Sequence, residues 1–289
     1  MTDDAPRPTT DDAPASTQAA RWNGPAGQAW GDLQEVLDGM FAPLADLLVG
    51  ELAGVDARDV LDVGCGSGAV AIGAVEALGA GARAVAVDVS SRLADLARAR
   101  AESRGADVEV VRADAATHPF EPGRFDAVTS RFGVMFFDDA TAAFANLRAA
   151  CRPGAALRVL TWRAPEENPF MTAAGRATER WIPGAGRPST SGPGQFGLSD
   201  RAAFAATLDA AGWGAVELVP VDVPCAFPAA DLAAYARRLG PVGGALDALP
   251  DGDRAAASTA ADAALARYVH GDEVRFTAAC WLARATATA

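Results

Sequence analysis

The sequence predicts an α/β domain in which a largely parallel sheet is covered by helices on both faces. Short apolar runs alternate with segments of helical periodicity from about residue 59 to residue 162. A glycine-rich turn joins the first run to a helix, and the second run stops at an acidic residue. Strands that alternate with helices imply right-handed crossovers and strand ends that gather at one edge. The length of 289 residues, half of them apolar, suits one such domain with additions.

The N-terminal region divides into a tail and a helical cover. Residues 1–18 are rich in Asp, Thr, Pro and Ala, a composition that predicts disorder. Residues 19–54 carry apolar side chains three and four positions apart, which predicts amphipathic helix in two segments divided by Pro43. The alternating region, residues 55–163, follows. Its five expected strands are 59–64, 83–88, 107–112, 125–131 and 156–162, with helices expected at 69–79, 91–104 and 138–151.

The regular alternation ends after Trp162, and two insertions are expected there. Residues 164–198 hold a short helix pattern at 169–180 and then a loop rich in Gly, Pro and Ser, which suggests a substrate lid. A helix capped by Ser199 should run to residue 211, followed by a strand at 216–223. Residues 228–269 form a second, helical insertion on the substrate side, broken at 240–244 and 250–252, and a last strand covers 274–285.

The glycine-rich turn has the features of a nucleoside-binding site. Gly64, Gly66 and Gly68 follow the first strand directly and precede a helix. Glycines let the backbone approach a ligand, and the next helix presents unpaired N–H groups and the positive end of its dipole. Asp88 lies about 20 residues beyond the turn at the end of the second strand, where an acid commonly binds ribose hydroxyls.

Two types of nucleoside cofactor fit this turn. Gly64, Gly66 and Ala69 satisfy the dinucleotide pattern G-x-G-x-x-A, which leaves an NAD(P)-dependent oxidoreductase as an alternative. Asp62, however, lies in the strand end, where it would repel a pyrophosphate and attract an ammonium group. Asp114 follows the third strand, so a second acid is available for an adenine amine. A ribose, an adenine and an α-ammonium group together favour S-adenosylmethionine.

Several segments resemble the class I S-adenosylmethionine-dependent methyltransferases over roughly residues 55–163. These segments are LDVGCGSG, VDVS, RADAATHPF, FDAVTSRFGVMFF and NLRAACRPGAALRVLTW. More narrowly, SRFGVMFF with RWNGPAGQAW is similar to the methyltransferases grouped with ubiquinone and menaquinone biosynthesis. The resemblance implies a single domain over 19–289 with a Rossmann-like seven-stranded sheet of order 3-2-1-4-5-7-6, whose last strand inserts antiparallel between the fifth and sixth. It also implies that the N-terminal helices lie over the cofactor.

The expected site combines motif residues with aromatic side chains. The cofactor-binding set is Asp62, Gly64, Cys65, Gly66, Ser67, Asp88, Val89, Asp114, Ala115, Ser130 and Arg131. Arg131 should pair with the cofactor carboxylate or with a nearby Asp. The candidate substrate pocket is formed by Trp22, Trp30, Phe132, Met135, Phe136, Trp162, Phe170, Trp181 and Phe196, for which core packing is the alternative. His118 is the candidate general base, although a structural role in the adenine-side turn fits its place better.

Composition and charge limit the classes of function that we expect for this chain. The formal charge of −12 and the pI near 4.6 argue against nucleic acid as a partner. The four cysteines are scattered, so neither a metal site nor a disulfide framework is indicated, and no signal or membrane-spanning segment is recognisable. We therefore expect a cytoplasmic methyltransferase of secondary metabolism with a small, apolar or aromatic acceptor, working by proximity. A protein that retains the cofactor without transferring methyl groups is a further alternative, and the sequence does not decide between a monomer and a homodimer.

Overall fold

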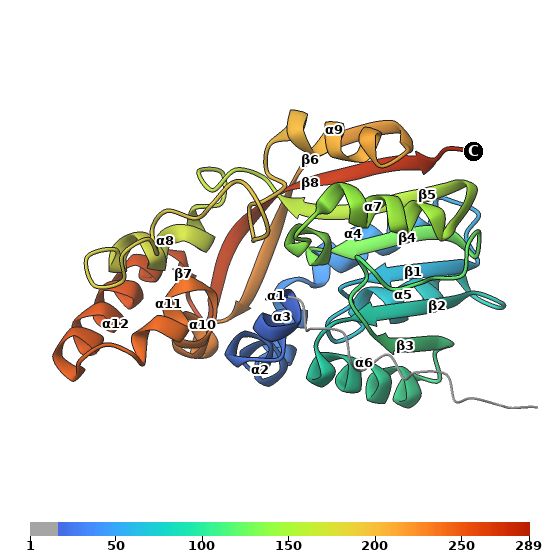
Figure 1. Cartoon of the computed structure of the whole chain (residues 1–289). Helices are drawn as coiled ribbons and strands as arrows, with labels where there is room; N and C mark the ends of the chain where they lie inside the picture. Colours follow the sequence, from blue (N-terminus) through green and yellow to red (C-terminus); the bar gives the residue numbers. More distant parts are fainter. Residues whose placement is uncertain (1–16) are drawn as a thin grey trace, which may run out of the picture.

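A computed structural model of the chain describes residues 17–289 (Figure 1). The predicted tail lies outside the described residues, except for Thr17 and Gln18, which begin a helix. The helices are α1 (Thr17–Trp22), α2 (Pro25–Asp32), α3 (Gln34–Met40), α4 (Ala42–Ala53), α5 (Ala69–Leu78), α6 (Ser91–Arg104), α7 (Ala140–Ala149), α8 (Pro169–Thr178), α9 (Arg201–Ala210), α10 (Leu232–Arg238), α11 (Gly240–Leu246) and α12 (Asp251–Leu265), with 3-10 turns η2 (Gly133–Phe136), η3 (Ala229–Asp231) and η4 (Ala266–Tyr268). The strands are β1 (Asp59–Val63), β2 (Arg83–Asp88), β3 (Val108–Arg112), β4 (Phe125–Arg131), β5 (Cys151–Trp162), β6 (Trp213–Pro228), β7 (Val269–His270) and β8 (Glu273–Ala287).

The strands form one sheet in the order β3-β2-β1-β4-β5-β8-β6, with the short β7 paired to β8. Neighbours from β3 to β5 are parallel, whereas β8 runs antiparallel between β5 and β6. This is the predicted order when β8 is counted as the seventh long strand, so the Rossmann-like fold class is confirmed. The sequence did not predict the two-residue β7.

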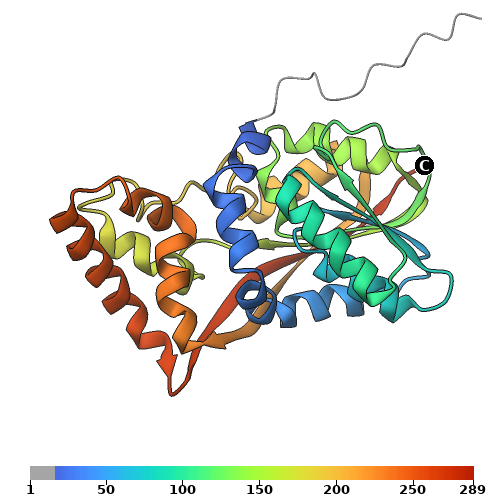
Figure 2. The ribbon, with the colours of Figure 1, turned by 90° about the horizontal axis from the view of Figure 1, so that it is seen from below.

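The sheet is the middle of three layers. Helices α4, α5 and α6 cover one face, and α7 and α9 cover the other (Figures 1 and 2). Every residue of β1 is buried, as expected for a central parallel strand. Val60 packs with alanines of α5 on one face, whereas Leu61 joins the larger cluster that includes Phe144 and Phe204 on the other.

Several predicted boundaries were wrong for identifiable reasons. The N-terminal cover, α1 to α4, has four helices rather than two, and Pro43 lies in the first turn of α4, where a missing N–H costs little. The cap of α9 is Asp200 rather than Ser199, because the Asp200 side chain accepts from the Ala203 N–H. α11 runs through the predicted break at 240–244, since burial of Val242 in the core offsets the poor helix propensity of its glycines.

The hairpin of β6 and β8 extends beyond the rest of the sheet. β5 pairs with β8 only as far as Trp162, opposite Cys280. Beyond that point residues 273–279 of β8 pair with residues 222–228 of β6. This two-stranded extension carries the helical lobe, which consists of α8, α10, α11 and α12 (Figures 1 and 2). The two predicted insertions, distant in sequence, therefore meet in one lobe.

Phe170 of α8 is the centre of the contact between the two insertions. Its ring stacks on Phe276 of β8 at a centroid distance of 4.2 Å and on Tyr235 of α10 at 5.4 Å. Phe227 and Tyr268 pack around the same ring. Phe170 is thus a core residue of the lobe, because both insertions bury aromatic rings against the hairpin.

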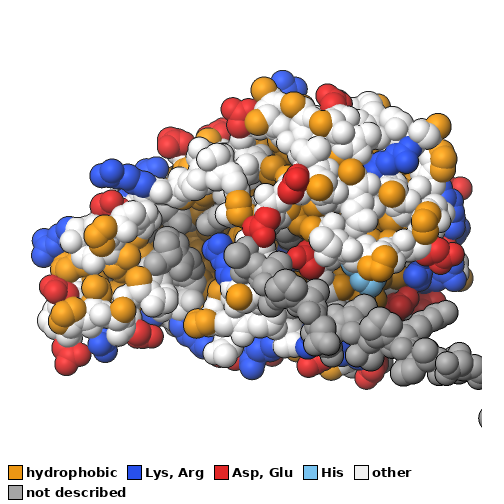
Figure 3. All heavy atoms as spheres, in the orientation of Figure 1, with side chains coloured by type: hydrophobic (Ala, Val, Ile, Leu, Met, Phe, Trp, Pro, Cys, Tyr) orange, Lys and Arg blue, Asp and Glu red, His pale blue; other side chains and the backbone are white. Residues whose placement is uncertain are grey.

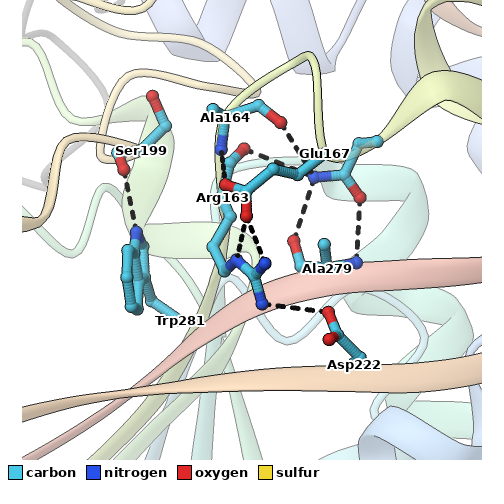
Figure 4. Close-up of polar contacts among 8 residues, drawn as sticks. Arg163, Ala164, Glu167, Ser199, Asp222, Ala279 and Trp281 are labelled. Carbon is cyan, nitrogen blue, oxygen red and sulfur yellow. Dashed lines mark hydrogen bonds and ion pairs between the residues drawn. The ribbon is translucent and has the colours of Figure 1, made fainter.

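A polar anchor joins the first insertion to the hairpin (Figure 4). The buried Asn168 amide donates to the Ala279 carbonyl at 2.9 Å and accepts from the Ala279 N–H at 3.0 Å. The pairing of β5 with β8 ends at Trp162, opposite Cys280. At the neighbouring residue of β8, Ala279, the side-chain amide of Asn168 makes the hydrogen bonds that a strand residue would make. Beside it Arg163 pairs with Glu167 and, at 2.9 Å, with Asp222.

The described surface carries mixed charge. In the face drawn in Figure 3, basic side chains are scattered among acidic ones over core and lobe, wherever the described residues form the surface. Among residues 17–289, no helix combines the length and hydropathy needed to cross a lipid bilayer.

Replacement of Asn168 by alanine should destabilise the protein by about 2 kcal/mol, because it leaves the buried Ala279 N–H without an acceptor. Glu167→Gln is the control at the same anchor; its side chain is 40% exposed, so its loss should cost at most about 1 kcal/mol. Urea unfolding of both variants measures the difference. Equal costs for the two would contradict the role assigned to the Asn168 amide.

Candidate functional site

The turn after β1 touches the exit of β4 through backbone atoms. Gly64 has φ of 65°, and a Cβ placed there would lie 2.6 Å from the Cα of Gly133. A Cβ on Gly133 would lie 2.5 Å from the Val63 carbonyl oxygen. Both positions therefore require glycine. The Gly64 N–H also donates to the Val87 carbonyl at 2.8 Å, which joins the turn to the end of β2.

Asp62 is buried beneath this turn. Its Oδ2 accepts from the Ala71 N–H at 3.0 Å and so caps α5, whose N-cap residue, Gly68, has no side chain to do so. Burial raises the pKa of Asp62 to about 7, while the nearby Arg131 guanidinium opposes the shift. The site thus holds a buried carboxyl group whose ionisation a neighbouring cation would favour.

Asp88 and Asp114 also accept from backbone N–H groups. One Asp88 oxygen accepts from Gly66 and the other from Ser90, both at 2.8 Å. Burial raises the pKa of Asp88, and these bonds oppose the shift. Asp114 accepts from the Ala116 N–H at 3.0 Å. These hydrogen bonds hold both acids at the ends of their strands.

Two adjoining cavities open at these strand ends. The larger, about 320 Å³, lies between the ends of β1, β2, β3 and β4 and is covered by α1 and α2. The smaller, about 40 Å³, lies between the glycine turn and α3. Trp30, Gly64, Gly66, Leu93, Arg131 and Phe132 contribute to both. A ligand with two unequal parts could occupy both compartments.

All residues of the predicted cofactor set except Ser130 line one or both cavities. The larger is lined by Gly64, Gly66, Asp88, Val89, Asp114, Ala115 and Arg131, and the smaller by Asp62, Gly64, Cys65, Gly66, Ser67 and Arg131. Ser130 is fully buried, and its Oγ donates to the Val63 carbonyl at 2.7 Å and accepts from the Gly133 N–H at 3.1 Å. It holds the β4 exit against β1.

The predicted substrate pocket divides into two groups. Trp22, Trp30, Phe132 and Phe136 line the cavities. Trp22 packs edge to face against Trp30 at 5.7 Å and against Phe136 at 5.2 Å. The cover and the β4 exit therefore supply one aromatic wall.

The remaining five predicted pocket residues line neither cavity. Met135 and Phe196 are buried in the core. Trp162 is also buried and stacks on Phe132 at 4.4 Å. Phe170 is the core of the helical lobe, and Trp181 lies in a separate apolar cluster of that lobe. Aromatic type alone did not distinguish rings that face a cavity from rings that pack between distant segments.

His118 is not among the residues that line the cavities. Its half-buried ring packs edge to face on Phe120 at 4.7 Å, and burial lowers its pKa. The Asn146 side chain donates to its carbonyl at 3.0 Å. These contacts agree with the structural role that its place in the sequence favoured.

Asp38 is the main site residue that sequence reasoning missed. Its carboxylate accepts from Ser67 Oγ at 2.9 Å and pairs with Arg100 of α6 at 2.7 Å. Gln34, one helical turn earlier, donates to the same carboxylate. The only available signal was the i, i+4 spacing of Gln34 and Asp38, two polar residues beside the apolar Leu37.

The cover is joined to the cofactor-side loop by Asn23. Its amide donates to the Val89 carbonyl at 3.0 Å and accepts from the Ser91 N–H at 2.9 Å. Asp32 of α2 pairs with Arg92 of α6 and with Arg238 of the helical lobe. The cover therefore contacts the loop that follows Asp88 on one side and the lobe on the other.

Comparisons with known proteins agree with this geometry. Residues 60–154 match the family model described as a methyltransferase domain. No curated protein matches the chain. Similar solved structures include the YcgJ protein of Bacillus subtilis, with TM-score 0.57, 16% identity, and 84% of this chain and 99% of that chain covered.

Two further structures share the fold. A putative methyltransferase of Bacillus halodurans has TM-score 0.53 and 19% identity, with 83% of this chain and 97% of that chain covered. Phosphoethanolamine N-methyltransferase 2 of Haemonchus contortus, in complex with S-adenosylmethionine, has TM-score 0.50 and 17% identity, with coverage of 84% and 52%. The family match covers the strands and turns that build the cavities. Residues 60–154 therefore resemble a methyltransferase domain, and the chain around them has the fold that these structures share.

Proposed function

We propose that the chain binds S-adenosylmethionine across the two cavities and transfers its methyl group to a small, largely apolar or aromatic acceptor. The observation that carries this proposal is the division of the site. The larger compartment lies beside Asp88 and Asp114, and the smaller lies beside Asp62, Ser67 and the glycine turn. A nucleoside suits the first compartment, and an amino acid suits the second.

The cofactor roles follow from the chemistry of each wall. Asp88 would bind the ribose hydroxyls, with Val89 packing on the adenine face and with Asp114 and the Ala115 backbone at the adenine edge. Asp62 would accept from the α-ammonium group. A buried carboxylate gains most from a cation that replaces lost solvent, so Asp62 suits this role better than contact with a pyrophosphate.

The oxidoreductase alternative receives less support. It requires a tyrosine or lysine near a nicotinamide, and the sequence contains no lysine. Its two tyrosines, Tyr235 and Tyr268, pack around Phe170 in the helical lobe, and neither lines the cavities.

The proposed mechanism rests on alignment. Methyl transfer is an in-line displacement, and holding nucleophile, methyl carbon and sulfur in line lowers the barrier without a dedicated catalytic residue. Trp22, Trp30 and Phe136 would exclude water and offer apolar faces to an acceptor. No histidine lines either cavity within the described residues, so the proposal assigns no base.

Incubation with methyl-labelled S-adenosylmethionine and a panel of phenols, quinols, amines and activated aromatic carbons tests the reaction. Label should move to at least one acceptor and leave S-adenosylhomocysteine. If label never leaves the cofactor while binding is retained, the chain is a protein that holds the cofactor without methylating. Titration with NAD in parallel tests the remaining alternative, and binding of NAD alone would refute the proposal.

Asp88→Asn should weaken S-adenosylhomocysteine binding by about 100-fold, because hydrogen bonds from two sugar hydroxyls to a charged acceptor are lost or reversed. Glu109→Gln, at an exposed position of β3, is the control and should bind like the parent protein. Calorimetric titration measures both. Unchanged affinity in Asp88→Asn would exclude the ribose assignment.

Binding of S-adenosylhomocysteine should weaken as the pH falls through about 7. The pKa of Asp62 is raised to about 7, so below that pH its carboxyl group carries a proton and no longer attracts an ammonium group. The titratable and charged groups that face Asp62 are Arg131, Asp88 and Cys65. In the protein without ligand, the stability changes with pH in the opposite direction. Protonated Asp62 is less costly to bury than the carboxylate, so its contribution to the free energy of unfolding rises as the pH falls from about 7. Titrations between pH 6 and pH 8 measure the trend, and Asp62→Asn should remove it. A pH dependence that persists in Asp62→Asn would assign the effect to another group.

A further inference from the structure

Gln18 of α1 places a buried hydrogen-bond acceptor at the larger cavity. The residue lines that cavity, and its side-chain oxygen, Oε1, is shielded from solvent. Within the described residues this oxygen has no hydrogen-bond partner. Of the side chains in residues 17–289 with such an atom, Gln18 is the one that lines either cavity. A buried acceptor without a donor is costly, so a ligand that supplies the donor would remove that cost.

Other polar side chains around the same cavity have partners in the protein. Asp88 and Asp114 accept from backbone N–H groups at the strand ends. Asp139 accepts from the Ala142 N–H at 2.9 Å and so caps α7. Arg131 donates to a backbone carbonyl of the cover at 3.2 Å. The unmet hydrogen bond therefore lies on the side of the cavity that α1 covers.

Several contacts hold α1 in place over the cavity. The Asn23 amide donates to the Ala19 carbonyl of α1 at 2.8 Å and to the Val89 carbonyl, just after β2, at 3.0 Å. Gly27 of α2 packs on the end of α1, since a Cβ there would lie 1.7 Å from the Trp22 carbonyl oxygen. These contacts fix the direction of α1 relative to β2, so the side chains on its cavity face are preorganised.

The neighbour of Gln18 on the cavity face of α1 is Trp22. The two residues are four positions apart, which places them on one side of the helix, and both line the cavity. The Trp22 ring packs edge to face against Phe136 at 5.2 Å. A flat apolar molecule that lies against these rings would therefore bring its edge toward the Gln18 amide.

We propose that Gln18 is a specificity residue for the methyl acceptor. Its Oε1 accepts a hydrogen bond from a hydroxyl or amino group of an aromatic acceptor that packs on Trp22 and Phe136. The adenine amine is another donor of this kind, but the proposed function gives it a partner in Asp114, at the end of β3. The inference rests on the proposed function and narrows its acceptor to aromatic compounds that carry a hydroxyl or amino group.

Calorimetric titration of the protein saturated with S-adenosylhomocysteine tests the assignment with two probes. 2-Naphthol carries a hydroxyl group, whereas 2-methoxynaphthalene has the same rings and no donor. The parent protein should bind 2-naphthol at least about tenfold more tightly, since only the hydroxyl group satisfies the buried oxygen. Gln18→Met keeps the length of the side chain and removes the amide, so the two affinities should then agree within about twofold.

Gln28→Met is the matched control, because Gln28 belongs to α2 of the same cover, is exposed and lines neither cavity. It should leave the ratio of the two affinities unchanged. Gln18→Glu keeps an oxygen atom at the same position and should retain the preference for 2-naphthol. The affinity for S-adenosylhomocysteine should match that of the parent in all three variants, which also shows that they are folded.

An unchanged ratio in Gln18→Met, or equal affinities of the parent protein for the two probes, would overturn the assignment. A parent protein that binds S-adenosylhomocysteine but neither probe would do the same. Weaker S-adenosylhomocysteine binding in Gln18→Met with no change of the ratio would also overturn it, because the amide would then contact the adenine. If the parent protein does not bind S-adenosylhomocysteine at all, the proposed function itself fails, so the two failures are distinguishable.

Discussion

The contact between the backbones of Gly64 and Gly133 is the constraint on which the site depends. It brings the turn after β1 against the exit of β4 at a distance that no side chain permits. Ser130 holds the same junction through the Val63 carbonyl. Because the two loops meet there, the ends of β1, β2 and β4 lie close together. Asp62, Asp88 and Arg131 therefore line two adjoining cavities.

The second constraint on the site is the burial of two charged side chains, Asp62 and Asp88. Asp62 and Asp88 are buried and accept hydrogen bonds from backbone N–H groups of the glycine turn, of α5 and of Ser90. A buried carboxylate is costly unless it is paired, so a ligand that supplies the opposite charge or hydroxyl donors would offset that cost. The N-terminal cover belongs to this arrangement, because Asp38 and Asn23 attach it to Ser67 and Val89.

The predicted cofactor residues other than Ser130 all line the cavities, because the signals that identified them are local. The spacing of Asp62, Gly64 and Asp88 depends on one strand-turn-helix-strand unit, and the structure retains that spacing. The residues of the predicted substrate pocket depend on contacts between distant segments. Phe170 packs in the lobe because Phe276, more than a hundred residues later, lies beneath it, and Asn168 anchors the first insertion to Ala279. Asp38 was missed because its partners, Ser67 and Arg100, lie on other elements. No periodic pattern encodes such pairs.

A crystal structure with bound S-adenosylhomocysteine would show whether the acids at the strand ends bind the nucleoside. Both carboxylate oxygens of Asp88 should lie within hydrogen-bond distance of the ribose hydroxyls, with Val89 on the adenine face, the Ala115 backbone at the adenine edge and the amino-acid end beside Asp62. A ligand sugar bound elsewhere, with Asp88 still bonded only to the Gly66 and Ser90 N–H groups, would contradict this prediction.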